Sequence, residues 1–387
     1  MSPPAHATLL ASGELEVVVG ASGDALDEAL SRAFSAIRAV SARENVARLG
    51  RDMGYRIEDA SRIEARGIAE SDVAPASRWL ARRLPPRAAV SCVPGDGPLV
   101  LHALIAPRAP EHARTYDVGA DGRVAVESVE LHVVEHCNLR CAQCCNVSPY
   151  LDERAMSVAE IRATCERLRE VVRPDVLKIM GGEPLLHSDL RGVLRAVRES
   201  GVAPRTRLFT NGLLLRSVDD ATFAELDELT VSSYASAPLK PELVAEVEAR
   251  ARRFDVVLNL KPVDTFSVVL SREARSDADA QAAYDTCWLR HRCLVVRGGV
   301  FYKCTRAAYH SDYQARVDLE GRDAAAEATQ RAQGIPLDAP GFAERLAAYL
   351  GSPDRIVSCT HCHGSSGPLS PHVQLRKRDV SAGRLAP

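Results

Sequence analysis

The middle of the chain alternates between two hydrophobic periods. Short apolar stretches such as VESVELHVVE (126–135) and ELTVSSY (228–234) have the length and the β-branched residues of strands. Between them, apolar residues recur every three or four positions, which is the spacing of one helix face. The pattern predicts strands at 126–135, 175–180, 205–212, 228–234 and 254–262, and helices at 157–172, 189–200, 219–227 and 241–252.

Regular alternation of strands and helices with short loops predicts an α/β fold built on a parallel sheet. Right-handed crossovers would curl five or six such units into a partial or full barrel. Ser157 and Glu160 form a capping-box signature at the start of the first helix. Ligands of such sheets bind at the carboxyl ends of the strands. A cysteine-rich loop after residue 135 and the GGEP loop (181–184) both lie there.

The alternation does not extend to the ends of the chain. The segment before residue 107 is predicted as a separate α/β unit, and the polar stretch 107–123 as a linker. The segment VVVGASGDA (17–25) fits an ordinary turn between strand and helix better than a phosphate-binding one. The unit's expected elements are strands at 14–20, 88–92 and 99–105 and helices at 24–40 and 42–53.

Four regions follow from these patterns. The tail is rich in Pro, Ser and Arg, which is typical of a flexible terminus. The predicted regions are an N-terminal α/β domain at 1–125, a core at 126–284, a second cysteine-rich domain at 285–365 and a flexible tail at 366–387.

Composition and charge argue against several classes of partner. A net charge of −2 over 387 residues gives no overall attraction to nucleic acid or anionic lipid. The first residues lack the basic and apolar regions of a signal peptide, and no apolar run has the length of a membrane span. We therefore expect a cytoplasmic protein with no nucleic-acid or membrane partner. Eleven cysteines in that reducing compartment indicate metal binding rather than disulfides.

Cys137, Cys141 and Cys144 follow the first strand of the core with the spacing C-x3-C-x2-C. A structural zinc site uses four ligands, commonly as two separated pairs. Three thiols on one short loop suit a [4Fe-4S] cluster better, because they ligate three irons and leave the fourth iron open.

This spacing, with NLR between the first two cysteines, resembles the radical S-adenosylmethionine (radical SAM) superfamily. The resemblance implies a partial (βα)6-type TIM barrel in which S-adenosylmethionine chelates the open iron of the cluster. It also implies that the reduced cluster cleaves S-adenosylmethionine to a 5′-deoxyadenosyl radical.

The same resemblance assigns expected roles to three loops. The GGEP loop would grip the methionyl amino group, with a carboxylate for the ammonium and glycines that allow close approach of the backbone. The TNG and SSY strand ends would contact the ribose or carboxylate of the cofactor, although a turn residue and a strand-end hydroxyl are equally good interpretations there. The expected cofactor-binding residues are Gly181, Gly182, Glu183, Pro184, Asn211 and Ser233.

Cys145 directly follows the three expected ligands but is not needed among them. We interpret it as a small buried apolar residue, with a hydrogen-atom donor or redox role as the alternative. Cys92 and Cys165 are isolated along the chain and receive the same apolar interpretation. His136 is expected to pack beside the cluster without ligating it.

A second group of cysteines has the layout C-x11-G-x4-C followed by C-x2-C. This layout resembles the twitch domain, a relative of the SPASM domain, and implies an auxiliary [4Fe-4S] cluster. Gly298 and Gly299 fit the turn of a hairpin in RGGVFYKC (297–304). The expected ligands are Cys287, Cys304, Cys359 and Cys362.

Two alternatives remain open for this second group. Four thiolates would equally suit a structural zinc ion. Cys293 could replace Cys287, because both precede the hairpin. Three nearby histidines are not needed as ligands, namely His291, His361 and His363.

The resemblance implies an enzyme that abstracts hydrogen from a substrate C–H bond. An auxiliary cluster that accepts an electron would favour net oxidation or rearrangement of a sugar- or aminocyclitol-like metabolite. A ribosomal-peptide maturase and a non-enzymatic zinc-binding scaffold are the alternatives. Besides S-adenosylmethionine and substrate, the expected partner is a reductant such as flavodoxin or ferredoxin. Lys303, Arg306 and Tyr309 follow the hairpin and are expected to face the site.

Overall fold

The computed structural model describes residues 115–317 and 333–384, together with Ala74 and five earlier strands. The chain divides into two compact units, Met1–Ala109 and Pro110–Pro387. The boundary therefore falls before the predicted one at residue 125, because the stretch from 115 onward already belongs to the second unit. Val118 bridges to Val124 there, at the start of that unit's first strand.

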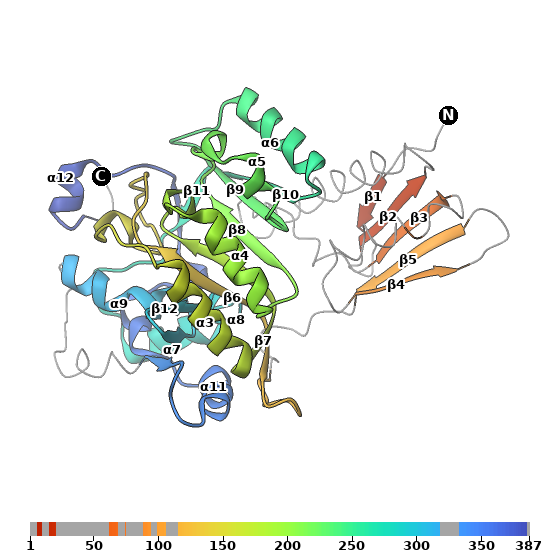
Figure 1. Ribbon diagram of the computed structural model, residues 1–387. Coiled ribbons are helices and arrows are strands. Elements are labelled where there is room, and N and C mark those ends of the chain that lie inside the picture. Colours follow the sequence, from red (N-terminus) through yellow and green to blue (C-terminus); the bar gives the residue numbers. More distant parts are fainter. Residues whose placement is uncertain are drawn as a thin grey trace. The chain divides into compact units, whose positions relative to one another are not determined.

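The first unit contains a five-stranded sheet in the order β1-β2-β3-β5-β4 (Figure 1). Strands β2 and β3 are parallel and the other pairs antiparallel. The predicted strands at 14–20, 88–92 and 99–105 are confirmed, β1 and β3 were not predicted, and the predicted helices at 24–40 and 42–53 lie outside the described residues. The strands are β1 (His6–Leu9), β2 (Leu15–Gly20), β3 (Arg62–Ile68), β4 (Ala88–Val93) and β5 (Leu99–Ile105).

The second unit is built on an eight-stranded sheet in the order β10-β9-β8-β7-β6-β12-β13-β14 (Figure 1). Its first five strands in sequence are parallel and alternate with helices, as predicted. They are β6 (Val124–Val134), α3 (Val158–Val171), β7 (Val172–Gly181), α4 (Leu190–Ser200), β8 (Thr206–Thr210), α5 (Asp220–Phe223), β9 (Glu228–Tyr234), α6 (Pro241–Arg253) and β10 (Val257–Val263).

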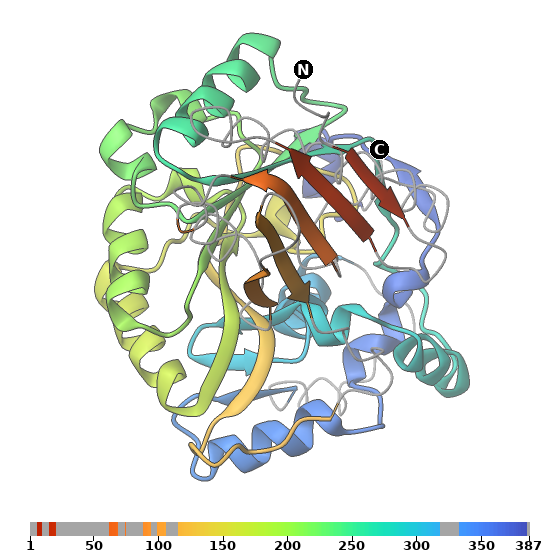
Figure 2. The same cartoon turned by 90° about the vertical axis from the view of Figure 1, so that its right-hand side faces the viewer.

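The helices line one side of this sheet, which Figure 2 shows with the green helices beside the strands. Leu131 and Ile179 point to that side and join the main hydrophobic core. Because side chains alternate along a strand, the neighbouring positions point to the other face. That face carries buried charges, including Glu130 and Lys178, whose carboxylate and ammonium lie 3.3 Å apart. The predicted capping box of Ser157 at the start of α3 is confirmed.

The second cysteine-rich region continues this sheet within the same compact unit, and its predicted bounds as a domain at 285–365 stay a prediction. Strand β12 (Leu294–Arg297) pairs in parallel with β6, and β13 (Val300–Tyr302) and β14 (Gly334–Pro336) follow antiparallel. Burial favours this pairing, because the side chains of Val295 and Val296 on the two faces of β12 are fully enclosed. The predicted hairpin turn is confirmed, with positive φ at Gly298 and Gly299.

The second unit contains further helices and short turns. Within the described residues, no helix is both long and apolar enough to cross a membrane. The helices are α7 (Asp277–Asp285), α8 (Leu289–Arg292), α9 (Thr305–Arg316), α11 (Phe342–Gly351) and α12 (Lys377–Ser381), with short 3-10 turns at η4 (Ser148–Tyr150), η5 (Pro184–Leu186), η6 (Leu215–Ser217), η8 (Val357–His361) and η9 (Gly364–Ser366).

The predicted flexible tail is wrong for residues 366–384. Strand β15 (Leu369–Pro371) pairs antiparallel with β11 (Thr265–Ser267). Leu375 is buried in a second hydrophobic cluster with Val147 and Tyr150, next to the cysteine loop. These apolar contacts offset the entropy lost by ordering the segment.

We predict that Leu375→Ala lowers the free energy of unfolding of the second unit by about 2–5 kcal/mol, as expected for a leucine removed from a packed core. Leu369→Ala, in the same segment, is the matched control. Leu375 is 2% exposed and Leu369 is 41% exposed, so the control should change stability by less than about 0.5 kcal/mol. Urea denaturation measures both, and equal effects would contradict the packing of this segment.

Candidate functional site

The first three predicted ligands lie together on the irregular loop after β6. Burial raises the pKa of Cys141, and the charges of Cys144 and Cys137 raise it further, which places the three thiols within electrostatic range of one another. Burial likewise raises the pKa of Cys137 to about 12. A metal would reverse this preference, because metal binding displaces the thiol proton.

The GGEP loop holds the start of this cysteine loop through two backbone hydrogen bonds. Gly182 N–H donates to the Val134 carbonyl at 2.6 Å, and Glu183 N–H donates to the His136 carbonyl at 3.0 Å. A Cβ on Gly182 would lie 1.9 Å from the His136 carbonyl oxygen. The glycines therefore allow two backbones to meet, which is a different reason for them than the expected close approach to a cofactor.

Glu183 connects the GGEP loop to the end of β8. Its carboxylate accepts hydrogen bonds from Thr210 Oγ1 at 2.6 Å, Asn211 N–H at 2.8 Å and Leu185 N–H at 3.0 Å. The residue is 1% exposed, and burial raises its pKa against these hydrogen bonds. Three of the carboxylate's roughly four acceptor positions are thus filled by the protein. Its expected contact with the methionyl ammonium stays a prediction.

The other predicted cofactor residues lie around the same loop. Asn211 Nδ2 donates to Asn138 Oδ1 at 2.6 Å and lies 3.8 Å from Cys137 Sγ. Pro184 is buried at the start of η5. Ser233 is half-buried at the end of β9, and its Oγ accepts the Leu239 N–H at 3.4 Å. Contacts of these residues to a cofactor also stay predictions.

Residues 373–375 of the C-terminal segment form backbone hydrogen bonds with the middle of the cysteine loop. Ala142 N–H donates to the Val373 carbonyl at 2.9 Å, and Leu375 N–H donates to the Arg140 carbonyl at 2.7 Å. Sequence reasoning missed this segment, although the alternating residues of HVQL (372–375) are a short strand signal.

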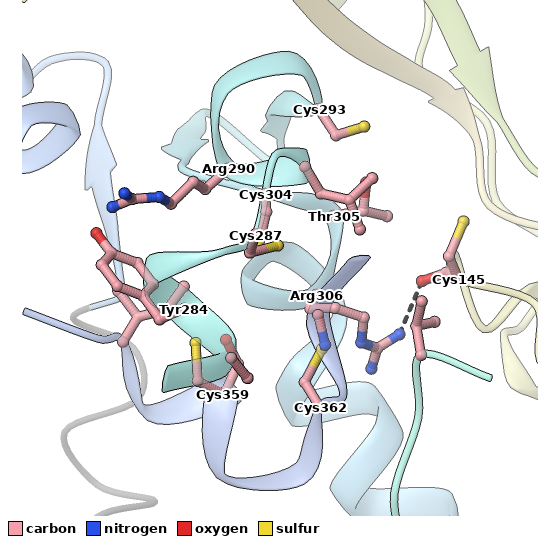
Figure 3. Close-up of a pocket in the computed structure, with 16 residues that line it drawn as sticks. Cys145, Tyr284, Cys287, Arg290, Cys293, Cys304, Thr305, Arg306, Cys359 and Cys362 are labelled. Carbon is pink, nitrogen blue, oxygen red and sulfur yellow. Dashed lines mark hydrogen bonds between the residues drawn. The ribbon is translucent and has the colours of Figure 1, made fainter. Parts of the chain in front are cut away.

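The second group of cysteines surrounds a cavity of about 80 Å³. This is several times the roughly 10–15 Å³ that one water molecule requires. In Figure 3 the sulfurs of Cys287, Cys359 and Cys362 point toward its centre. Burial and the charges of Cys287 and Cys362 together raise the pKa of Cys304 to about 12, so Cys304 belongs to the same group.

Two further cysteines line this cavity. The sulfur of Cys293 points away from the other four thiols in Figure 3. Cys145 lines the cavity with its carbonyl toward Arg306, while its sulfur points away from the other thiols in Figure 3. The residue is exposed, so its interpretation as a small buried apolar residue is wrong. Cys165 is fully buried in α3, as expected, and the side chain of Cys92 lies outside the described residues.

The thiols around the cavity are not arranged as ligands of one ion. Four thiolates on a single zinc ion lie about 3.8 Å apart, from a Zn–S bond of about 2.3 Å. Among the described residues, no three His, Cys, Asp or Glu side chains converge in that way on a point. A donor set of four cysteines around an enclosed space fits a larger, sulfur-bridged group.

The three residues expected to face the site behave differently. Arg306 lines the cavity, and its Nη1 donates to the Cys145 carbonyl at 2.8 Å (Figure 3). Lys303 is buried instead beside Tyr284, whose hydroxyl accepts from its Nζ at 2.6 Å, and burial lowers the pKa of the lysine to about 8. Tyr309 is buried, with its hydroxyl 2.5 Å from His132 Nδ1.

Comparison with known families identifies the part of the chain that carries the first cysteines. Residues 131–237, from within β6 to just past the end of β9, match the family model of the Radical SAM superfamily. This segment is similar to radical SAM domains.

Curated relatives match over a similar length. GTP 3′,8-cyclase of Streptomyces coelicolor is 31% identical over 149 residues, which are 36% of this chain and 41% of the relative. GTP 3′,8-cyclase 1 of Mycobacterium tuberculosis is 31% identical over 144 residues, 35% of this chain and 39% of the relative. The chain thus spans about two fifths of the length of these relatives.

Solved structures show weaker likeness. BtrN in complex with AdoMet and 2-DOIA is 18% identical, covers 62% of this chain and 94% of its own, and has a TM-score of 0.38. Streptococcus suis SuiB bound to S-adenosylmethionine is 14% identical, covers 35% of this chain and 40% of its own, and has a TM-score of 0.25.

We predict that Gly182→Ala displaces the start of the cysteine loop, because its Cβ would meet the His136 carbonyl. The expected cost is about 1–3 kcal/mol of unfolding free energy, typical of overpacking, with loss of about four bound irons per chain. Gly351→Ala is the control, since its Cβ would meet nothing within 4 Å. Iron analysis and thermal denaturation check both variants, and normal iron content in Gly182→Ala would contradict the prediction.

Proposed function

We propose that this chain is a radical SAM enzyme with two [4Fe-4S] clusters. The observation that carries the proposal is that Cys137, Cys141 and Cys144 lie on one irregular loop at the carboxyl end of β6, within the segment that matches the radical SAM family model. Three thiols ligate three irons of a cluster and leave the fourth for S-adenosylmethionine. When bound and reduced, that pair supplies a carbon radical able to take hydrogen from an unactivated C–H bond.

The residues around this loop would orient the cofactor. The loop's backbone is fixed on both sides, by Gly182 and Glu183 and by the C-terminal segment. Rigid backbone positions are what a cluster with one open iron requires, because a small displacement of a ligand changes the geometry at that iron. Cofactor contacts are assigned to the GGEP loop, to Asn211 beside Cys137 and to Ser233 at the end of the neighbouring strand.

Cys287, Cys304, Cys359 and Cys362 are the proposed ligands of the second cluster. Cys304 is the residue before helix α9, and although burial raises the pKa of its thiol overall, hydrogen bonds from the backbone amides of Ala307 and Arg306 oppose that rise. Cys287 is preferred to Cys293 because its charge acts on Cys304, Cys359 and Cys362.

The reaction that we favour is the oxidation or rearrangement of a sugar- or aminocyclitol-like metabolite. The two thiol sites are adjacent, because Cys145 directly follows Cys144 and also lines the second cavity. A substrate radical formed near the first site would therefore lie within reach of a second redox centre that can take up its electron. A flavodoxin- or ferredoxin-type reductant would supply the first cluster.

Assays with other candidate substrates would distinguish the alternative functions. Product analysis with a precursor peptide would identify a peptide maturase, and the relatives make a nucleotide such as GTP a further substrate to assay. Zinc in place of iron, with no cleavage of S-adenosylmethionine, would identify a binding scaffold and overturn the proposal.

We predict that anaerobically purified protein is brown, carries about eight irons per chain and cleaves S-adenosylmethionine under reductant. Cys141→Ala should leave about four irons and reduce 5′-deoxyadenosine formation to background, because the first cluster then loses one of its three ligands. Chromatographic assay of 5′-deoxyadenosine and iron analysis test this. Colourless zinc-loaded protein, or an active Cys141→Ala variant, would disprove it.

We predict that Cys287→Ala removes the second cluster and leaves about four irons per chain, while Cys293→Ala keeps about eight. The two cysteines line the same cavity, so the pair separates ligation from general damage to the fold. Iron analysis and electron paramagnetic resonance (EPR) of the reduced proteins distinguish the variants. The reverse result would assign Cys293 as the ligand.

A further inference from the structure

Arg306 lies between the two groups of thiols. It is the second residue after Cys304, and its Nη1 donates to the carbonyl of Cys145, the residue after Cys144, at 2.8 Å. A single hydrogen bond therefore joins the segment with the first group's Cys144 to the segment with the second group's Cys304. Figure 3 shows the guanidinium between Cys145 and Cys362.

The guanidinium is buried and only partly satisfied. Arg306 is 5% exposed, and its Nη2 finds no hydrogen-bond acceptor among the described residues. The guanidinium lies 5.1 Å from the ring of Tyr313, which stabilises its charge from one side without accepting an N–H in the plane. An unsatisfied charged donor in a protein interior is costly, so an acceptor is expected where it points.

The groups around Arg306 narrow the identity of that acceptor. Its charge acts on the thiols of Cys144, Cys145 and Cys362 and on the buried imidazole of His310. Burial lowers the pKa of His310 to about 3, so it carries no charge at neutral pH. Three of these four groups are thiols, so sulfur is the candidate partner.

We propose that Arg306 donates its free N–H to a sulfur of the second cluster and raises that cluster's reduction potential, while its other N–H fixes the Cys144–Cys145 segment beside it. The proposal rests on the second cluster of the proposed function. A hydrogen bond to a cluster sulfur and a nearby positive charge both stabilise the more negative, reduced state. Helix α9 adds to this effect, because Cys304 lies at its positive N-terminal end.

The role proposed for Arg306 is that of a positioning residue. One N–H tunes the second cluster and another fixes the Cys144–Cys145 segment. The planar fork of arginine can donate in two directions at once, whereas lysine keeps the charge as a single point. Arg306→Met should therefore lose both effects, and Arg306→Lys should lose part of them.

The test is an EPR-monitored redox titration of the full-length protein. The parent protein for this test has Cys137, Cys141 and Cys144 all replaced by alanine, and each variant is made in this parent. The second cluster alone then contributes the EPR signal. At a fixed solution potential, Arg306→Met should lower the ratio of reduced to oxidised cluster about tenfold. This corresponds to a decrease of about 59 mV in the cluster's reduction potential for one electron. Arg306→Lys should show a smaller decrease in the same direction.

Arg316→Met is the matched control, because it removes the same charge from the same helix. Arg316 is exposed and pairs with Asp152, so its loss should leave the potential unchanged. An equal shift in both variants would overturn the proposal, since it would then reflect net charge alone.

Unchanged potential in Arg306→Met with the cluster loaded would overturn the role of Arg306 and leave the proposed function intact. If Arg306→Met binds no iron, the test rests on Arg306→Lys. A reduction potential in Arg306→Lys equal to that of the parent protein would then overturn the proposal. Failure of both variants to load would assign Arg306 to cluster assembly and overturn its tuning role. A parent protein without a second cluster would overturn the proposed function itself.

Discussion

The loop that carries Cys137, Cys141 and Cys144 has no regular secondary structure, so its backbone groups need partners from elsewhere in the chain. It finds them on two sides. The GGEP loop donates two backbone hydrogen bonds to the carbonyls of Val134 and His136, and the C-terminal segment pairs with Arg140 and Ala142. Every thiol of the first group depends on these contacts, because an irregular loop fixed at only one end could not hold three sulfurs in one orientation.

The second constraint is the pairing of β12 with β6, which brings the second group of cysteines beside the first. Strand β12 ends at Arg297, whose guanidinium forms a pair with Glu135 at 2.7 Å and another with Asp312 of α9 at 2.7 Å. Glu135 lies two residues before Cys137, and α9 begins after Cys304. One half-buried arginine thus ties the start of the first loop to the helix that follows the second hairpin. Arg306 makes a second connection closer to the sulfurs.

Sequence reasoning predicted the parallel core well, because its signals are local. Periodicity marked β6 to β10 and the helices between them, Ser157 and Glu160 marked the start of α3, and two glycines marked the hairpin turn. It missed contacts that depend on distant residues. The expected cofactor contact of Glu183 stays a prediction, but the protein donors that its carboxylate accepts from, on β8, just after it and in its own loop, were not predicted, because the fold alone decides which donors reach it.

The sequence by itself determined the α/β alternation, the spacing of the thiols and therefore the class of chemistry they suggest. Those properties are set by neighbours along the chain, through backbone periodicity and ligand spacing. The tertiary structure decided that the second cysteine region extends the first sheet, that the tail is ordered against the cysteine loop, and that Cys145 lines the second cavity. Such features depend on burial and hydrogen bonds between residues more than a hundred positions apart, and no local pattern encodes them.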